Sequence, residues 1–511
     1  MNFTVGEYLN LLEGENQAIT SELYRMREEE VSSITYESAK ADPGSLFICK
    51  GALFKKTYLE EAVFKGSICY ISEKDYGLEQ VAHILVKNVR AAMPLLAKKF
   101  YQVPEGILKY IGITGTKGKT TTTYYIKKIF DEYMKQTGGR DIACLTSVET
   151  YDGKERKSAR ITTPESLELY RHFRNACDSG ITYLAMEVSS QALKYGRVSG
   201  ISFDVGVFLN ISEDHISPVE HKNFKDYFCS KLRLFSQVRT AVVNLDSEFS
   251  RMLLIKASSA GRILTFGTKP GADIYGHDIC VENGTVSFFV TCDRFEGKFS
   301  LAMHGIFNVE NALASIAVAY AYELPLATMQ KVLKEVTLNG RMEEYNSRNQ
   351  KLKVIVDYAH NGLSFEKIFA SVRMEYPDYK IVSVFGCPGG KALNRRRDMG
   401  LIAGKFCSKV YLSTDDPGPE EIKDICMEIG RFVEDTGCSY ECIFDREEAI
   451  KKAIMEAKGD TVVLVLGKGG ENNQRIGQIF CAYKSDAEVV RECIREYDSK
   501  LLDERMGLSV E

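Results

Sequence analysis

Long apolar runs and an excess of positive charge are both missing from this chain of 511 residues. No segment approaches the roughly 20 apolar residues that a membrane-spanning helix requires, and the N-terminus lacks the pattern of a secretory signal. Lysine and arginine total 66 against 70 aspartate and glutamate residues, which gives a net charge of −4. A basic, aromatic-rich groove is missing too, so we expect no nucleic-acid partner. The sequence predicts a soluble, cytoplasmic protein with no membrane partner, in which locally placed cations meet any anionic ligand.

Cysteine pairs at zinc spacing are also missing. The 14 cysteines are scattered, and the nearest suggestive pair, Cys438 and Cys442, has no second pair to complete a zinc site. In a reducing compartment we expect free thiols. The chain shows no internal repeat and no low-complexity segment.

What the chain does contain is an alternation of short apolar segments with longer helical patterns. Hydrophobicity in these segments is continuous, which is typical of strands buried on both faces of a parallel sheet. The fold class is therefore predicted to be α/β. The predicted strands are 110–113, 183–188, 205–209, 241–244, 354–357, 381–385 and 462–466.

Two changes of pattern divide the chain, whose length suggests two to four domains. A lysine-rich helical segment ends near Pro104, just before a new strand–helix unit. A second helical segment stops at Gly340, and a new strand starts at Lys353. These boundaries predict three domains, 1–105, 106–340 and 341–511.

The segment GITGTKGKTTTTYYI, residues 112–126, has the context of a phosphate-binding loop but not its usual form. The pattern G-x-x-x-x-G-K-[ST] requires a glycine where this chain has Ile113. A predicted strand enters the turn and a helix leaves it, so backbone N–H groups form an anion cradle. Lys119 is then placed to reach the phosphates of ATP, and the Thr120 hydroxyl to ligate Mg²⁺. A structural turn with an exposed Lys-Thr is the alternative.

The form of this loop, G-[IV]-T-G-T-x-G-K-T-T, resembles that of the Mur ligases, the ATP-dependent amide ligases of peptidoglycan synthesis. The similarity extends along most of the chain and points to the MurE type, which adds the third amino acid of the peptide. It implies an N-terminal α/β UDP-binding domain, a central P-loop parallel-sheet ATPase domain and a C-terminal Rossmann-like α/β domain. It also implies the ATP contacts of the loop, which are Gly115, Thr116, Lys117, Gly118, Lys119, Thr120 and Thr121.

The resemblance implies a two-step reaction between small molecules, carried out by a monomer. ATP phosphorylates the D-Glu carboxylate of UDP-MurNAc-L-Ala-D-Glu, and the α-amine of an amino acid attacks the acyl phosphate. The implied catalytic residues are Lys119, Glu187, His215, Lys231 and His360. Mg²⁺ is implied to bind Thr120, Glu187, His215 and Lys231.

Lys231 is implied to carry a CO₂-derived carbamate, because that group is an oxygen ligand of the kind Mg²⁺ prefers. His360, in the segment DYAHN, is implied to steady the tetrahedral intermediate. From the residues alone, Lys231 reads as a surface lysine on a helix and Glu187 as a solvated strand end.

Further contacts are implied for ATP and for the muramoyl peptide. Asn308 and Asn311 lie one helical turn apart for the adenine, Arg341 meets the phosphates and Asp357 the ribose. The implied muramoyl-peptide contacts are Ser38, Thr162, Thr163, Ser189 and Arg197. From the residues alone, Thr163 before Pro164 predicts a helix N-cap, and so does Asn308.

The identity of the incoming amino acid depends on departures from the family pattern. Relatives that add meso-diaminopimelate carry DNPR, whereas this chain has DDPG at 415–418 and lacks the arginine for a distal carboxylate. Lysine is therefore favoured, with ornithine or another diamine open. The implied contacts are Arg396, Asp415, Asp416 and Glu471.

Other functions remain open. Ala39, Gln191 and Gly470 replace an arginine and two histidines that are common in the family, which keeps open a nucleotide-binding protein without catalysis. A folylpolyglutamate synthase-like ligase shares the loop but begins close to it, whereas residues 1–105 precede it here. A generic P-loop NTPase would hydrolyse ATP without any amine.

Overall fold

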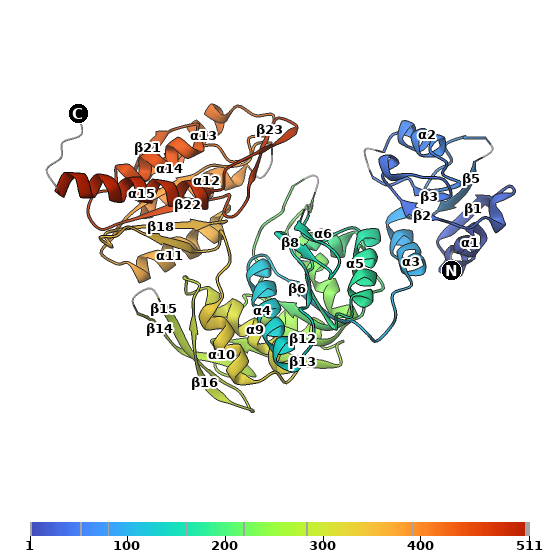
Figure 1. The fold of residues 1–511 in the computed structure, drawn as a ribbon, viewed down its shortest axis with the longest axis horizontal. Coiled ribbons are helices and arrows are strands. Elements are labelled where there is room, and N and C mark those ends of the chain that lie inside the picture. The colour runs from blue at the N-terminus through green and yellow to red at the C-terminus, as the bar shows by residue number, and fades with distance from the viewer. Residues whose placement is uncertain are drawn as a thin grey trace.

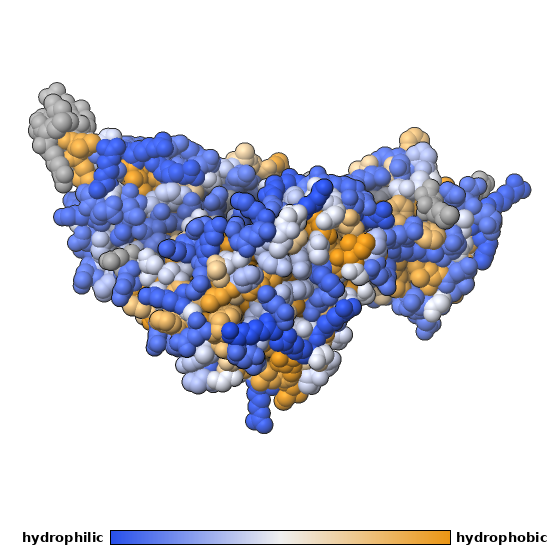
Figure 2. Space-filling model, turned by 60° about the horizontal axis from the view of Figure 1, so that its bottom comes forward, coloured by the Kyte–Doolittle hydropathy of each residue, from blue (hydrophilic) through white to orange (hydrophobic). Residues whose placement is uncertain are grey.

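Three sheets, each covered by helices, follow one another along the chain (Figure 1). The N-terminal and C-terminal parts lie on opposite sides of the large central part. The face in Figure 2 is mainly hydrophilic, with apolar side chains in scattered groups. This computed structural model describes residues 3–51, 54–79, 81–159, 161–217, 220–282, 285–390 and 393–505.

The N-terminal sheet has five strands in the order β1-β5-β4-β3-β2. Strands β2 to β5 are parallel, and β1 runs antiparallel to β5. Its strands are β1 (Ala18–Glu22), β2 (Ser33–Thr35), β3 (Ser45–Ile48), β4 (Cys69–Ser72) and β5 (Ala82–Val86). Its helices are α1 (Val5–Gly14), α2 (Lys56–Phe64) and α3 (Val89–Tyr101), with short 3₁₀ helices η1 (Met26–Glu28) and η2 (Ser38–Lys40).

The central sheet has eleven strands, in the order β16-β15-β14-β13-β12-β11-β6-β10-β7-β8-β9. Strands β14 to β7 in this order are parallel, and antiparallel strands extend both edges. The parallel strands are β6 (Lys109–Thr114), β7 (Ala143–Leu145), β10 (Tyr183–Glu187), β11 (Phe203–Phe208), β12 (Val238–Asn244), β13 (Arg262–Gly267) and β14 (Ile274–Glu282). The edge strands are β8 (Glu149–Tyr151), β9 (Arg156–Ser158), β15 (Thr285–Thr291) and β16 (Glu296–Leu301).

Helices cover both faces of this sheet because its strands are apolar on both sides. On β10, Leu184 and Met186 pack in one core and Ala185 in the other. The first core contains α5 (Ser166–Asp178), α6 (Ser190–Lys194), α7 (Phe224–Leu232), η3 (Arg233–Gln237) and α8 (Ser250–Ala257). The second contains α4 (Lys119–Thr137), α9 (Asn308–Ala321) and α10 (Leu326–Glu335).

The C-terminal sheet has six strands in the order β17-β18-β22-β19-β20-β21, and only β17 is antiparallel to its neighbour. Its strands are β17 (Glu343–Asn346), β18 (Leu352–Asp357), β19 (Lys380–Phe385), β20 (Lys409–Leu412), β21 (Ser439–Cys442) and β22 (Thr461–Leu466). The covering helices are α11 (Gly362–Glu375), α12 (Asn394–Phe406), α13 (Ile422–Glu434), α14 (Arg446–Met455) and α15 (Asp486–Arg505). A separate hairpin consists of β23 (Asn473–Ile476) and β24 (Ile479–Ala482).

The predicted α/β fold class is confirmed, and each predicted strand overlaps an observed one. The domain boundaries at 105 and 340 stay predictions. All 14 cysteines are free thiols. Among the described residues, no helix is both long and apolar enough to cross a membrane.

Candidate active site

The predicted phosphate loop connects β6 to α4 at the carboxyl edge of the central sheet, where ligand sites of parallel sheets form. Gly118 is the N-cap of α4 with a left-handed φ of +84°, and a Cβ there would lie 2.2 Å from the Asn311 side-chain oxygen. The loop is also fixed by Asn210, whose carbonyl accepts from the Thr116 N–H at 3.0 Å and whose side chain accepts from the Lys117 N–H at 2.9 Å. Glycine is therefore required at 118 by both conformation and space.

Two lysine amines meet at the loop carbonyl of Gly115. Lys119 Nζ donates to it at 3.0 Å and to the Thr116 carbonyl at 3.2 Å, and Lys231 Nζ donates to it at 2.8 Å. Lys231 is only 1% exposed, so the alternative of a surface lysine is wrong. Burial, with Lys119 nearby, holds the pKa of Lys231 well below its usual value.

Glu187 ends β10 directly beside this loop. Its Oε1 accepts from the Thr120 hydroxyl at 2.9 Å and from the Ser147 N–H at 2.9 Å. The side chain is buried, so the alternative of a solvated strand end is wrong. Thr120 and Glu187, two of the predicted Mg²⁺ ligands, are thus in direct contact.

His215, another predicted ligand, follows an aspartate that joins two domains. His215 has a left-handed φ of +57°, which is uncommon for a residue other than glycine, and its Nδ1 lies 3.0 Å from Glu220. Asp214 pairs with Lys117 at 3.5 Å in its own domain. It also accepts from Arg395 at 3.1 Å and from the Asn361 side chain at 2.7 Å, both in the C-terminal part.

The Asp214 side chain is 6% exposed, and burial alone would raise its pKa, but Lys117, His215 and Arg395 outweigh burial and hold the pKa well below its ordinary value. Neither Asp214 nor Asn361 was predicted from the sequence as a site residue. The only sequence signal was that Asp214 is adjacent to a selected histidine.

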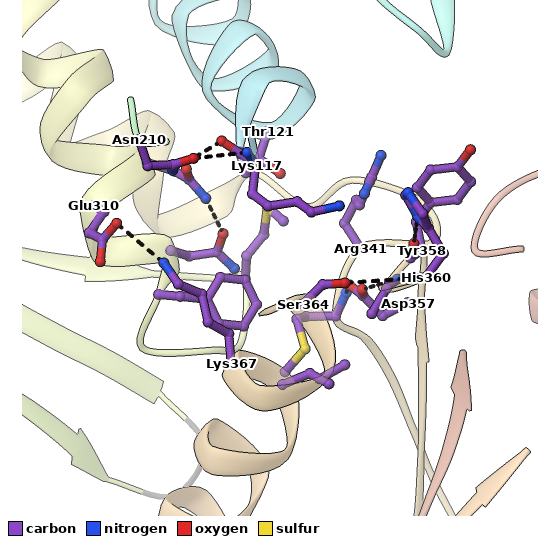
Figure 3. A pocket seen from close by; sticks show the side chains of 18 residues that line it. Lys117, Thr121, Asn210, Glu310, Arg341, Asp357, Tyr358, His360, Ser364 and Lys367 are labelled. Atoms are coloured by element: carbon purple, nitrogen blue, oxygen red, sulfur yellow. Dashed lines mark hydrogen bonds and ion pairs between the residues drawn. The ribbon is translucent and has the colours of Figure 1, made fainter. Parts of the chain in front are cut away.

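A pocket of about 690 Å³, its open mouth included, lies between the central and C-terminal parts (Figure 3). Lys117 extends across it toward Arg341 (Figure 3). The lining includes seven predicted ATP contacts, Lys117, Gly118, Thr121, Asn308, Asn311, Arg341 and Asp357, and the predicted catalytic residue His360.

Polar partners fix the side chains in this pocket. The Asn308 amide donates to the His304 carbonyl at 2.6 Å, and that of Asn311 donates to Asn308 at 2.9 Å. The N-cap of α9 is Phe307, so the predicted Asn308 cap is wrong. The Asp357 carboxylate accepts from the N–H groups of Met342 and Ala359, at 2.8 and 2.7 Å.

The pKa values of His360 and Lys117 are both lowered in this pocket. Burial, Lys117 and Arg395 hold the pKa of His360 well below its usual value. Its Nδ1 is 2.7 Å from the Tyr358 carbonyl, which can only accept, so the proton is on Nδ1 and Nε2 keeps a lone pair. Burial lowers the pKa of Lys117 to about 8, although Asp214 raises it.

Three of the predicted muramoyl-peptide contacts lie together beside Glu187. The Thr163 hydroxyl donates to the Glu187 carbonyl at 2.8 Å and accepts from the Ser189 N–H at 2.9 Å. Arg197 donates to the Thr163 carbonyl at 3.1 Å. The N-cap of α5 is Glu165, so the predicted Thr163 cap is wrong, because its hydroxyl is bound to the neighbouring strand instead.

Two residues that were not selected complete this region. Glu165 Oε1 pairs with Arg197 at 2.9 Å and with Lys50 at 2.8 Å, which joins the segment just after the N-terminal strand β3 to the central part. Thr162 adjoins this cluster in the chain, whereas Ser38 lies on η2 and donates to Glu61 at 2.7 Å. The roles of all five predicted contacts stay predictions.

The predicted amino-acid contacts lie at the carboxyl edge of the C-terminal sheet. Lys468, 1% exposed, pairs with Asp416 at 3.0 Å and with Glu471 at 2.5 Å. Burial raises the pKa of Asp415 to about 6. Arg396 instead points away to Glu420 and Glu428, at 2.7 and 2.6 Å, which does not favour its predicted contact with substrate.

The structure shows the surroundings of Ala39, Gln191 and Gly470, the three residues that depart from the family pattern. Ala39 lies on η2, and the Gln191 amide donates to Glu220, the partner of His215, at 3.4 Å. At Gly470 a Cβ would lie 3.1 Å from the Asn339 carbonyl, so glycine allows a close backbone approach there.

Known proteins match this chain over most of its length. The model of the Mur ligase middle domain matches residues 113–319, and that of the Mur ligase glutamate ligase domain matches residues 340–469. A UDP-N-acetylmuramyl-tripeptide synthetase of Lactobacillus delbrueckii subsp. bulgaricus is 36% identical over 490 residues, which cover 92% of this chain and 94% of the relative. A UDP-N-acetylmuramoyl-L-alanyl-D-glutamate–L-lysine ligase of Streptococcus mutans is 38% identical over 461 residues, which cover 90% of this chain and 92% of the relative.

A solved structure shares the fold. A UDP-N-acetylmuramoyl-L-alanyl-D-glutamate–2,6-diaminopimelate ligase aligns with a TM-score of 0.65 and 24% identity, over 97% of this chain and 99% of that one. At this identity the likeness concerns the three-domain fold alone.

Proposed function

Because this chain belongs to the Mur ligase family, we propose that it is an ATP-dependent amide ligase of peptidoglycan precursor synthesis. It adds the third amino acid to UDP-MurNAc-L-Ala-D-Glu. The observation that carries the proposal is the meeting of Lys119 and Lys231 at the phosphate loop with Thr120 and Glu187, beside a pocket shared with the C-terminal part.

The reaction proceeds through an acyl phosphate. The D-Glu carboxylate attacks the γ-phosphorus of ATP, and ADP leaves. The α-amine of the amino acid then attacks the acyl carbon, loses a proton and expels inorganic phosphate. Lys117, Lys119 and Arg341 counter the charge of the phosphates, and the pocket between the central and C-terminal parts orients the reactants.

The donor set at the loop fits Mg²⁺. The Thr120 hydroxyl and the Glu187 carboxylate are oxygen donors already in contact, at 2.9 Å, and hard oxygen ligands are what this ion prefers. Thr120, Glu187, His215 and a modified Lys231 would hold it. When bound, the ion supplies positive charge to the phosphates.

The unmodified Lys231 amine does not fit a cation site, whereas its carbamate does. Complete burial beside Lys119 disfavours the ammonium form, and a neutral amine is the form that adds to CO₂. The amine bonds to CO₂ and releases one proton, which leaves an anionic carbamate. A ¹³C NMR signal of a carbamate in the protein with ¹³C-bicarbonate, lost in Lys231→Arg, supports this step, and no difference between the two proteins contradicts it.

His360 is better placed to accept a proton than to donate a hydrogen bond to the tetrahedral intermediate. With the proton on Nδ1, its Nε2 lone pair is free to take the proton that the attacking amine loses. This assignment replaces the expected role of steadying the tetrahedral intermediate.

Lysine is the amino acid that we propose. Asp415, Asp416 and Glu471 provide three carboxylates around the ammonium of Lys468. The guanidinium of Arg446, which also acts on Asp415, is already paired with Asp486, so a second ammonium is favoured there. Gly418 stands where an arginine would pair with the distal carboxylate of diaminopimelate. The relative from Streptococcus mutans is named as a lysine ligase.

The direct test is phosphate release with ATP, Mg²⁺ and UDP-MurNAc-L-Ala-D-Glu, against lysine, meso-diaminopimelate and ornithine in parallel. Release with lysine that requires the muramoyl substrate supports the proposal. Release with diaminopimelate alone contradicts the choice of lysine. If the protein binds ATP but releases phosphate with none of the three amino acids, the result would instead support a protein that has lost catalysis. Phosphate release without any amine would support a simple NTPase.

A folylpolyglutamate synthase-like ligase would release phosphate with a folate and glutamate but not with the UDP substrate. We also propose that the protein acts in the cytoplasm as a monomer. Light scattering after size exclusion tests the oligomeric state, and a dimer mass would contradict it.

A further inference from the structure

Tyr358 lies between the nucleotide pocket and the carboxylates of the proposed amino-acid site. It follows Asp357 at the end of β18 and lines the pocket next to Arg341 (Figure 3). The Arg341 guanidinium carbon is 4.5 Å from the centre of the Tyr358 ring. At the other end of the ring, the Tyr358 hydroxyl donates to Glu471 Oε1 at 3.1 Å. One side chain thus contacts a residue of each site.

The backbone around this ring is packed tightly enough to transmit a displacement. Gly340 has a left-handed φ of +67°, and a Cβ there would lie 1.9 Å from the Gly470 nitrogen. A Cβ on Gly469 would lie 3.0 Å from the Tyr358 Cβ and 2.7 Å from the Gly340 carbonyl. The segments that carry Arg341, Tyr358 and Glu471 are therefore in direct backbone contact, and interiors packed in this way are not continuously deformable.

The two oxygens of Glu471 are held by different partners. Lys468 pairs with Oε2 at 2.5 Å and also with Asp416, whereas Oε1 accepts from the neutral phenol. A second resident cation at Oε1 would cancel the remaining negative charge of the site. The neutral phenol of Tyr358 orients Glu471 without cancelling this negative charge. Its ring also offers Arg341 a planar face for stacking.

We propose that Tyr358 is a positioning residue that sets Arg341 for the phosphates of ATP and Glu471 for the side-chain ammonium of the amino acid. This inference rests on the proposed function for the identity of the two ligands. The two contacts use different parts of the side chain, so substitutions separate them. Phenylalanine keeps the ring under Arg341 and removes the hydroxyl, and leucine removes both.

The test compares Tyr358→Phe and Tyr358→Leu with the wild type in the full-length chain. We expect Tyr358→Phe to raise the KM for lysine about tenfold, because a hydrogen bond to a charged group is lost, with the KM for ATP within twofold. Tyr358→Leu should raise both KM values, that for ATP at least threefold. Titration calorimetry measures the affinity for ATP in the absence of the amino acid. This affinity should be lower than wild type in the leucine variant and unchanged in the phenylalanine variant.

A matched control is available in the same domain. The buried Tyr411 donates its hydroxyl to Glu456 at 2.5 Å, and Lys409 lies 4.4 Å from its ring centre. Tyr411→Phe removes an equivalent hydrogen bond away from the pocket, so it should leave both KM values unchanged. A comparable rise in KM for lysine in this variant would assign the effect to general loosening of the domain and overturn the inference.

A double-mutant cycle tests whether Tyr358 acts through Glu471. In the Glu471→Gln background, Tyr358→Phe should raise the KM for lysine by less than twofold further. Full additivity of the two effects, or equal changes in both KM values for Tyr358→Phe alone, overturns the proposal. Wild-type protein that binds ATP but forms no amide would refute the proposed function instead, and the calorimetric comparison would still decide the Arg341 contact.

Discussion

Asp214→Asn is the substitution for which the structure predicts the most specific loss. Asp214 belongs to the central domain, and two of its partners, Asn361 and Arg395, belong to the C-terminal part. Lys117 of the phosphate loop is its third partner, at 3.5 Å. Asparagine preserves the volume and one acceptor oxygen but removes the charge, so Lys117 and Arg395 lose their common counter-ion.

The expected magnitude follows from burial. Loss of one partner from a buried ion pair costs about 3–5 kcal/mol. Lys117 and Arg395 keep 20% and 14% of their side-chain surface exposed, so water screens part of this energy. With one acceptor preserved, we take about 2 kcal/mol for the contact between the domains, which is about 30-fold in an equilibrium constant.

Two measurements check this number. Phosphate release should show kcat/KM for ATP reduced about 30-fold, and small-angle scattering should show a larger radius of gyration without ligands. Arg395→Met should give a similar loss, and the double variant should lose little more than either single one, since both remove the same pair.

Asp204→Asn is the matched control. Asp204 also lies between two cations, Lys109 at 3.6 Å and Arg239 at 3.5 Å, but all three belong to the central domain. It should leave the radius of gyration unchanged. Asp214→Asn with more than a third of wild-type activity and an unchanged radius would refute the argument that this carboxylate holds the two domains together.

Three further predictions concern the phosphate loop. Lys119→Ala should reduce phosphate release below about one thousandth of wild type with little change in melting temperature, as expected for a group that acts on the transferred phosphoryl charge, and near-normal turnover would refute the loop assignment. kcat/KM for ATP should fall as pH rises through about 8, because Lys117 of the free enzyme is protonated below its pKa of about 8 and neutral above it; a pH profile of kcat/KM checks this, and Lys117→Arg should move the descending limb to higher pH. The effect of Lys117 on stability has the opposite sign, since a folded-state pKa below the ordinary 10.5 means that its burial penalty is complete below pH 8 and is relieved as pH rises toward 10.5. Gly118→Ala should cost about 1–3 kcal/mol of stability and weaken ATP binding, because alanine is strained at this φ and its Cβ would approach Asn311; calorimetric unfolding checks it, and an unchanged melting temperature contradicts it.

The fold was predictable because its signal is local. Continuous apolar runs marked β10, β11 and β22 as strands buried on both faces, and the two cores that share β10 explain why no alternation appears there. The phosphate loop was predictable for the same reason, since strand, turn and helix lie within one short segment. The N-cap predicted at Thr163 was wrong because its hydroxyl bonds to residues that are distant in the sequence. The Thr163 hydroxyl is bound by Glu187 and Ser189, and the α5 cap falls at Glu165 instead.

The site itself depends on contacts between residues far apart in the chain, which no pattern of neighbours encodes. Lys231 reaches Gly115 across 116 positions, and Asp214 reaches Arg395 across 181. Arg395 and Arg396 make the limit clear. Successive residues on a helix are rotated by about 100°, so on α12 Arg395 faces Asp214 and Arg396 is held by Glu420 and Glu428. The two residues are of the same type and adjacent in the chain, so only the way α12 packs against α13 and the central domain decides which of them reaches Asp214.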